Sequence, residues 1–179
     1  MRGTSHRLLG RYLATHYLDS VPRRHIRAFL LGCIEPDRNP ATYLKGSIRR
    51  QWFRGHNWGN AQHYIRRVSR RLECRSQLHL LDYYALGRLI HYTTDAFTDA
   101  HNERFSFDLN SHSRYESVLQ IHFLDYLSSS PIPRITRMNS IMDTIQAFHR
   151  DYLQHPGDIH TDSQFTLCAC CSMLSALCI

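Results

Sequence analysis

Apolar side chains recur at spacings of three and four residues along most of the chain, which is the period of an amphipathic α helix. Between residues 5 and 19, for example, Leu9, Leu13 and Tyr17 form one apolar stripe that begins at His6. Alternating apolar and polar positions, which are typical of half-buried strands, are missing from the sequence. The pattern therefore predicts an all-α fold.

Seven helices account for this periodicity, with most of the glycine and proline between them. The predicted ranges are 5–19, 24–33, 61–72, 77–97, 111–127, 140–154 and 162–179. Pro36 is expected to end the second helix and to present Asp37 from a loop, because proline cannot donate the next helical hydrogen bond. The segment from there to Gly59 is predicted to be irregular, and Asn60 to be the N-cap of the third helix. A chain of 179 residues favours one compact domain over residues 1–179.

The charge balance indicates a basic protein whose cations are almost all arginine. Lys and Arg number 22 against 15 Asp and Glu, giving a net charge of +7, and Lys45 is the only lysine. Arginine suits phosphate and carboxylate, so lipid phosphate and nucleic acid are both candidate partners. One face of the third predicted helix carries four arginines, either as a solvated surface or as a phosphate tether: Arg66, Arg67, Arg70 and Arg71. The sequence gives no indication of oligomeric state.

The cysteine positions and the absence of a signal segment point to a reducing compartment. The N-terminal residues lack an unbroken apolar segment with a cleavage site, and the longest apolar segment, 165–179, is shorter than a membrane span. We therefore predict a cytoplasmic protein that has no transmembrane helix and is in contact, at most, with a membrane surface. Four of the six cysteines lie in the tail, where they are small buried side chains, or bind a metal, or carry an attached lipid.

Two histidine and carboxylate pairs stand out, His91 with Asp95 and His112 with Glu116. In each pair the residues are four apart and so project from one helix face, where they can bind the same metal ion or neighbouring ions. Chance gives about one such pair for 13 His and 15 acidic residues. Both pairs share their faces with apolar residues, so a carboxylate there needs a partner: either a divalent cation or a network of hydrogen bonds. Gly87, one turn before His91, would let another element approach closely.

The order of these residues resembles a known family. His91, Asp95 and His101 give H-x3-D-x5-H, and His112 with Glu116 gives H-x3-E after a short loop. This run is similar to that of the bacterial zinc-dependent phospholipase C family, whose wider relatives are single-strand-specific zinc nucleases. Further similarities lie upstream, in Thr4-Ser5-His6, the segment from Gly32 to Asp37 and Gly55-His56. The resemblance covers residues 4–120, and residues 140–179 are expected to add C-terminal helices.

The resemblance implies an all-helical fold with a multinuclear zinc site in a cleft between helices. One zinc would be held by four residues: Asp37, His56, His91 and Asp95. A second would be held by His101, His112 and Glu116. Asp95 would also bridge to a third ion bound by His6, which the N-terminal tryptophan completes in secreted relatives; here two ions are expected and the third is left open. His63 is an alternative to His56.

The implied chemistry is hydrolysis of a phosphodiester, with Asp37 orienting or deprotonating the attacking water. Glu116 favours a phospholipid head group, because the nuclease relatives have aspartate there. Arg38 stands where choline-recognising enzymes have an aromatic residue, which favours an anionic head group or a phosphomonoester. A nuclease remains the alternative, with three aromatic residues as stacking surfaces: Trp52, Phe53 and Trp58. A non-catalytic, zinc-stabilised helical protein or a membrane-surface binding protein is a further alternative.

Overall fold

The prediction of an all-α fold is confirmed. The computed structural model describes residues 1–39, 58–102, 105, 109–129, 132–133, 135–136, 138 and 140–177. The helices in these residues are α1 (Gly3–Tyr17), α2 (Arg23–Arg38), α3 (Trp58–Glu73), α4 (Leu80–Ala96), the 3-10 turn η2 (Asp99–His101), α5 (Leu109–Ser129), α6 (Ile141–Tyr152) and α7 (Ile159–Ala176). Within this part of the chain, every helix is too short or too polar to cross a bilayer.

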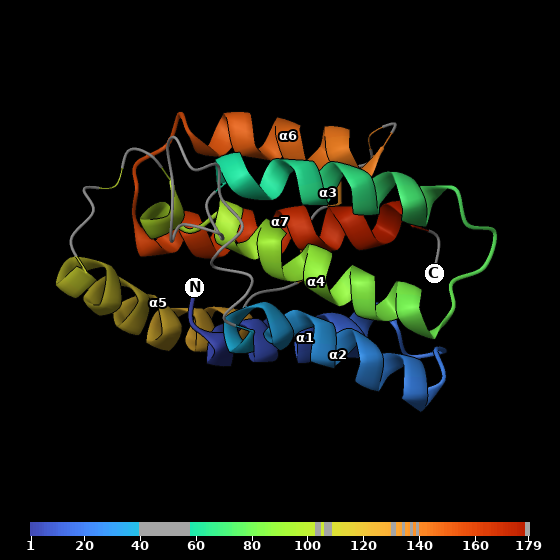
Figure 1. Ribbon diagram of the computed structural model, residues 1–179. Coiled ribbons are helices and arrows are strands. Elements are labelled where there is room, and N and C mark those ends of the chain that lie inside the picture. Colours follow the sequence, from blue (N-terminus) through green and yellow to red (C-terminus); the bar gives the residue numbers. More distant parts are fainter. Residues whose placement is uncertain are drawn as a thin grey trace.

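Helix α4 is the centre of the bundle. It packs against α1, α2, α3 and α7, and Figure 1 shows it between the α1 and α2 pair on one side and α3 with α6 on the other. Every side chain from Leu89 to Ala96 is buried. A helix that is apolar nearly all round is stable only when other elements cover it completely. The polar residues in that stretch must therefore find their partners inside the protein.

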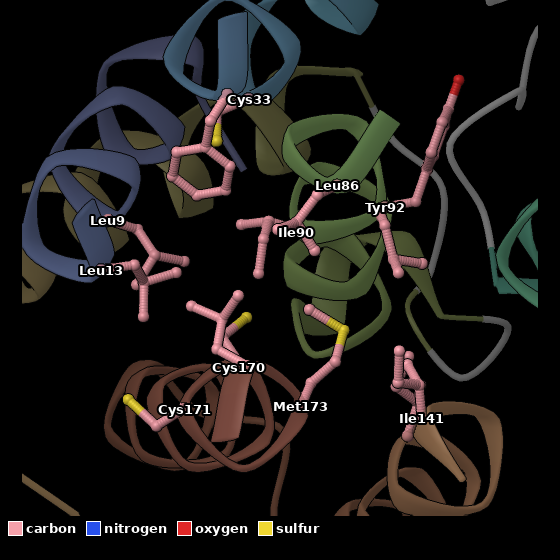
Figure 2. Packing of buried hydrophobic residues seen from close by; sticks show 14 of the residues in the cluster. Leu9, Leu13, Cys33, Leu86, Ile90, Tyr92, Ile141, Cys170, Cys171 and Met173 are labelled. Carbon is pink, nitrogen blue, oxygen red and sulfur yellow. The ribbon is translucent and has the colours of Figure 1, made fainter. Parts of the chain in front are cut away.

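The main core lies where α1, α4 and α7 meet. Figure 2 shows Leu9 of α1, Ile90 of α4 and Cys170 of α7 converging, with Met173 beside them. Cys170 and Cys171 are both buried there, which agrees with the interpretation of these tail cysteines as small apolar side chains. The side chains of this core are apolar and hold the helices in place by packing, and they include the side chain of Met1, whose backbone belongs to the polar cluster described below.

Helices α2 and α4 touch backbone to backbone at two glycines. A Cβ atom added at Gly87 would overlap the carbonyl oxygen of Phe29, and one at Gly32 would overlap that of Tyr84. The expectation that Gly87 leaves room for another element is therefore correct, and that element is α2. This crossing brings the C-terminal end of α2, with Cys33 and Asp37, against the middle of α4.

Several predicted helix boundaries are wrong, and two of them concern residues singled out in the sequence. Helix α2 continues through Pro36 to Arg38, so Asp37 lies in its last turn and not in a loop. Proline there disturbs only the end of the helix, and Pro36 is itself buried. Helix α3 begins at Trp58, so Asn60 lies within its first turn and is not the N-cap; Trp58 is stacked on His149 of α6, which anchors this earlier start.

Candidate metal centre

His91 and Asp95 lie one turn apart on α4 and are fully buried. The Nδ1–H group of His91 donates to the carbonyl of Cys33 on α2 at 2.9 Å. This bond leaves Nε2 facing two carboxylates, 3.3 Å from Oδ2 of Asp95 and 3.5 Å from Oδ1 of Asp37. The carbonyl of α2 thus fixes the orientation in which His91 can present Nε2 to a cation.

His6 joins this pair from α1. Its ring is stacked on that of His91 with 3.8 Å between the centroids, and its Nε2 lies 3.2 Å from Oδ1 of Asp95. Each of the three residues offers one ligand atom within 4.8 Å of the other two. We call His6, His91 and Asp95 the buried group.

A second set, which we call the outer group, consists of His101, His112 and Glu116. His101 ends the turn η2, and the other two lie one turn apart on α5. Nε2 of His101 is 3.1 Å from Oε1 of Glu116, and Nδ1 of His112 is 4.0 Å from Oε2 of the same residue. Their ligand atoms also lie within 4.8 Å of one another, and all three side chains are partly exposed. The outer group therefore borders solvent.

Met1 connects the two groups. Its amino nitrogen lies 2.8 Å from Oδ1 of Asp95 and 2.9 Å from Oε1 of Glu116, and it also contacts Nε2 of His101. The carbonyl oxygen of Met1 accepts from Nε2 of His6 at 3.1 Å. The sequence resemblance left the third ion open, because Met1 stands where secreted relatives have an N-terminal tryptophan. The amino nitrogen of Met1 lies beside Asp95, and its carbonyl oxygen lies beside His6.

The charges of the cluster are mutually stabilising. Burial alone would raise the pKa of Asp95, but the Met1 ammonium and the His101 ring outweigh it and hold the pKa well below its ordinary value. The same two groups overcome burial at Glu116 and lower its pKa as well. Burial lowers the pKa of His6 to about 4. Ionised carboxylates and a neutral imidazole are the forms that bind metal ions.

The donor set fits zinc. Among the described residues, the two groups are those in which at least three histidine, cysteine or carboxylate ligand atoms converge, and both consist of imidazole nitrogens and carboxylate oxygens. Zinc accepts such ligands, and sites without thiolates that keep open positions are typical of catalytic rather than structural zinc. The buried carboxylate of Asp95, with imidazoles on several sides, is the kind of group that a divalent cation neutralises.

The remaining predicted site residues fall at the edge of this centre or outside it. The carboxyl group of Asp37 lies beside His91 and against Gly3, and Arg38, which follows it, is exposed. His56 lies outside the described residues, as do Trp52 and Phe53. His63, the alternative to His56, is an exposed residue of α3 that belongs to neither group.

The arginine face of α3 is exposed, and part of it is paired within the chain. Arg67 and Arg71 line a hollow of about 390 Å³ between α3 and α4, together with Arg88. Arg71 donates to Asp82 through two nitrogens, and Nε of Arg88 lies 3.3 Å from Glu35. Of the four arginines of this face, Arg71 is thus held by a carboxylate of the protein itself, which favours a structural role over a phosphate tether for that residue.

Fold and site together define an all-helical protein in which two groups of imidazoles and carboxylates between the helices could each hold a metal ion. The chain belongs to the zinc-dependent phospholipase C family, because the model of that family matches residues 5–166. The match extends well beyond residue 120, where the similarity of motifs ended. No curated protein and no solved structure matches the chain.

Proposed function

We propose that this protein is a zinc-dependent phosphodiester hydrolase that cleaves the head group from a phospholipid. Family membership supports a phospholipase C-like zinc hydrolase. The observation that carries the proposal is the position of Asp95, a fully buried carboxylate whose Oδ2 faces His91 and whose Oδ1 faces His6 and His101. The carboxylate of Asp95 thereby connects the two sets of metal ligands.

The ligands divide among two or three ions. Asp37, His91 and Asp95 would hold the first, with His56 as the fourth ligand that the resemblance implies. The outer group would hold the second. A third would lie at His6 and Asp95, where the nitrogen and carbonyl oxygen of Met1 also point. Bound zinc would lower the pKa of a water at the site toward about 7 and would supply positive charge for the phosphoryl oxygens.

Exposure defines the side from which substrate enters. His6, His91 and Asp95 have no exposed side-chain surface, whereas Asp37 and His112 are 21% and 23% exposed. The scissile phosphate would therefore approach over Asp37 and the outer group. Asp37 is placed to orient the attacking water and accept its proton, and the exposed Arg38 beside it is placed to bind an anionic head group.

The proposed reaction transfers the phosphoryl group to water. The oxygen of water bonds to phosphorus, and the bond between phosphorus and the glycerol oxygen breaks. The proton released from water ends on the glycerol hydroxyl of diacylglycerol. The products are thus diacylglycerol and a phosphorylated head group.

Turnover of mixed micelles tests the proposal. The zinc-loaded protein is incubated with micelles that contain either an anionic or a zwitterionic phospholipid, and diacylglycerol is measured. We expect release of diacylglycerol, faster from the anionic lipid, and a loss of about 100-fold or more in kcat/KM for His91→Ala and Glu116→Ala. His16→Ala, which removes an exposed imidazole on α1, should match the wild type.

Two results would contradict the proposal. Hydrolysis of single-stranded DNA without any release of diacylglycerol would indicate a nuclease. Zinc binding that raises the melting temperature while no phosphoester is turned over would indicate a structural role for the metal.

A further inference from the structure

Asp162 is a buried carboxylate outside both ligand groups. It lies in the first turn of α7 and has no exposed surface. Its oxygens accept three hydrogen bonds: from the hydroxyl of Tyr152 at 2.6 Å, from the hydroxyl of Tyr115 at 2.8 Å and from the backbone N–H of Asp99 at 2.9 Å. The family motif does not include this residue, and the sequence pattern indicated only that a helix begins there.

Two of these three donors adjoin ligands of the outer group. Asp99 is the first residue of η2, and His101 is the last. Tyr115 precedes Glu116 on α5. The third donor, Tyr152, ends α6. One carboxylate therefore connects α7 both to the turn that carries His101 and to the helix that carries His112 and Glu116.

The turn η2 is held by two backbone bonds and by the side chain of Asn102, which donates to the carbonyls of Ala96 and Thr98. The N–H groups of His101 and Asn102 donate to the carbonyls of Thr98 and Asp99, both at 2.9 Å. A three-residue 3-10 turn has poorer hydrogen-bond geometry than an α helix, so a contact from α7 adds to its support. The chain just before α7 also presses on it, because a Cβ atom added at Gly157 would lie 2.5 Å from the carboxyl atoms of Asp99.

The three donors also suit an acidic residue at this buried position. Burial raises the pKa of the Asp162 carboxyl to about 7, and the hydrogen bonds from Tyr152, Asp99 and Tyr115 counteract the rise. An ionised carboxylate accepts all three bonds at once, whereas a protonated carboxyl or an amide must use one of its groups as a donor. The chemistry of aspartate thus suits a junction at which three donors meet.

We propose that Asp162 is a positioning residue for the outer group: it fixes η2 against α5 so that His101 meets His112 and Glu116 in the geometry that binds zinc. This inference rests on the proposed metal-binding role of that group. Residues that orient metal ligands through hydrogen bonds typically change metal affinity by about 10- to 100-fold when they are replaced.

Zinc titration of Asp162→Asn tests the proposal. The full-length, metal-free protein is titrated with zinc in competition with a chromophoric chelator, which resolves tighter and weaker sites. His112→Ala identifies the outer group, because it removes one of its ligands. We expect Asp162→Asn to weaken the zinc-binding step that His112→Ala also affects, by about 10- to 100-fold, and to leave the other zinc-binding steps unchanged. The double variant should bind zinc like His112→Ala alone.

Two further variants separate positioning from general stability. Leu167→Ala removes a buried side chain of the main core from the same helix, so it should lower the melting temperature and leave all zinc steps unchanged. Tyr115→Phe removes one donor and keeps the carboxylate, so it should weaken the outer step by a few-fold even if Asp162→Asn fails to fold.

The outcomes are distinguishable. If Asp162→Asn and Tyr115→Phe bind zinc as the wild type does, or weaken every step equally, the positioning role is wrong while the metal centre stands. If the wild type binds no zinc at all, both the metal centre and the role of Asp162 are wrong.

Discussion

Asp95 carries a negative charge in a position without access to water. The charge is stabilised mainly by the Met1 ammonium and by the imidazoles of His101 and His91. Because an unpaired buried charge is strongly unfavourable, each of these neighbours is coupled to the others through this one carboxylate. At the scale of single residues, the metal centre is thus a set of charges that stabilise one another.

Asp82 offers a test of charge pairing away from the metal centre. It is buried at the start of α4 and accepts from the His79 N–H group and from Arg71. Although burial opposes them, these donors lower the pKa of Asp82 below its ordinary 3.8. A lowered pKa contributes stability that is complete above the unfolded value and is lost as pH falls through the folded value.

We therefore expect Asp82→Asn to reduce the free energy of unfolding by about 1–3 kcal/mol at neutral pH. The difference from the wild type should shrink below about pH 4, where the wild-type carboxyl becomes protonated. Urea denaturation at several pH values measures this, with Asp19→Asn as an exposed control. A difference that is constant from neutral to acidic pH would show that the pairing of Asp82 is unimportant.

The sequence predicted those metal ligands that lie close to one another along the chain. His91 with Asp95 and His112 with Glu116 are recognisable because spacing of four on a helix places two side chains together. Met1 and Asp162 could not be predicted in this way. They meet their partners across 94 and 63 residues, and such contacts depend on how the helices pack.

At the scale of elements, the crossing of α2 and α4 connects packing to the metal centre. The close approach at Gly32 and Gly87 places the Cys33 carbonyl on His91 and brings Asp37 beside the same ring. The orientation of a metal ligand therefore depends on two residues that have no side chain.

Replacing Gly87 with alanine should separate these two helices. The added methyl group overlaps a backbone carbonyl, which cannot move without shifting α2. We expect a loss of about 1–3 kcal/mol in stability and weaker zinc binding at the buried group. Gly59→Ala is the matched control, because Gly59 is exposed on α3 and alanine there should be neutral or slightly stabilising. Equal zinc affinity of the Gly87→Ala variant and the wild type would contradict the link between crossing and site.

Helices themselves could be predicted better than their ends. Apolar periodicity indicated all seven α helices, because each buries one face. The ends depend on contacts that periodicity does not contain. The stacking of Trp58 on His149 accompanies an earlier start of α3, and the side chain of Asp158 caps α7 before the predicted start at residue 162.

At the scale of the whole molecule, the metal ligands and the apolar core use different side chains, although Met1 takes part in both through its backbone and its side chain. The centre lies among α1, α2, α4, η2 and α5, whereas the core includes α6 and α7 as well. Apolar packing should therefore maintain the fold when zinc is removed, and zinc should add stability to it.

Chelation is expected to abolish turnover reversibly and to leave the helical circular dichroism signal in place. Zinc at 100 to 1,000 times its dissociation constant should raise the free energy of unfolding by about 3–4 kcal/mol for each independent site. Thermal melts with and without chelator measure this, and magnesium serves as the control ion. Complete unfolding on chelation would contradict the separation of core and centre.

The most direct test of the account is a crystallographic anomalous-scattering map of the zinc-loaded protein, collected at the zinc absorption edge. We expect one peak among Asp37, His91 and Asp95 and a second among His101, His112 and Glu116, with any third peak at His6 and Met1. A map that lacks both the first and the second peak would contradict the proposed metal centre.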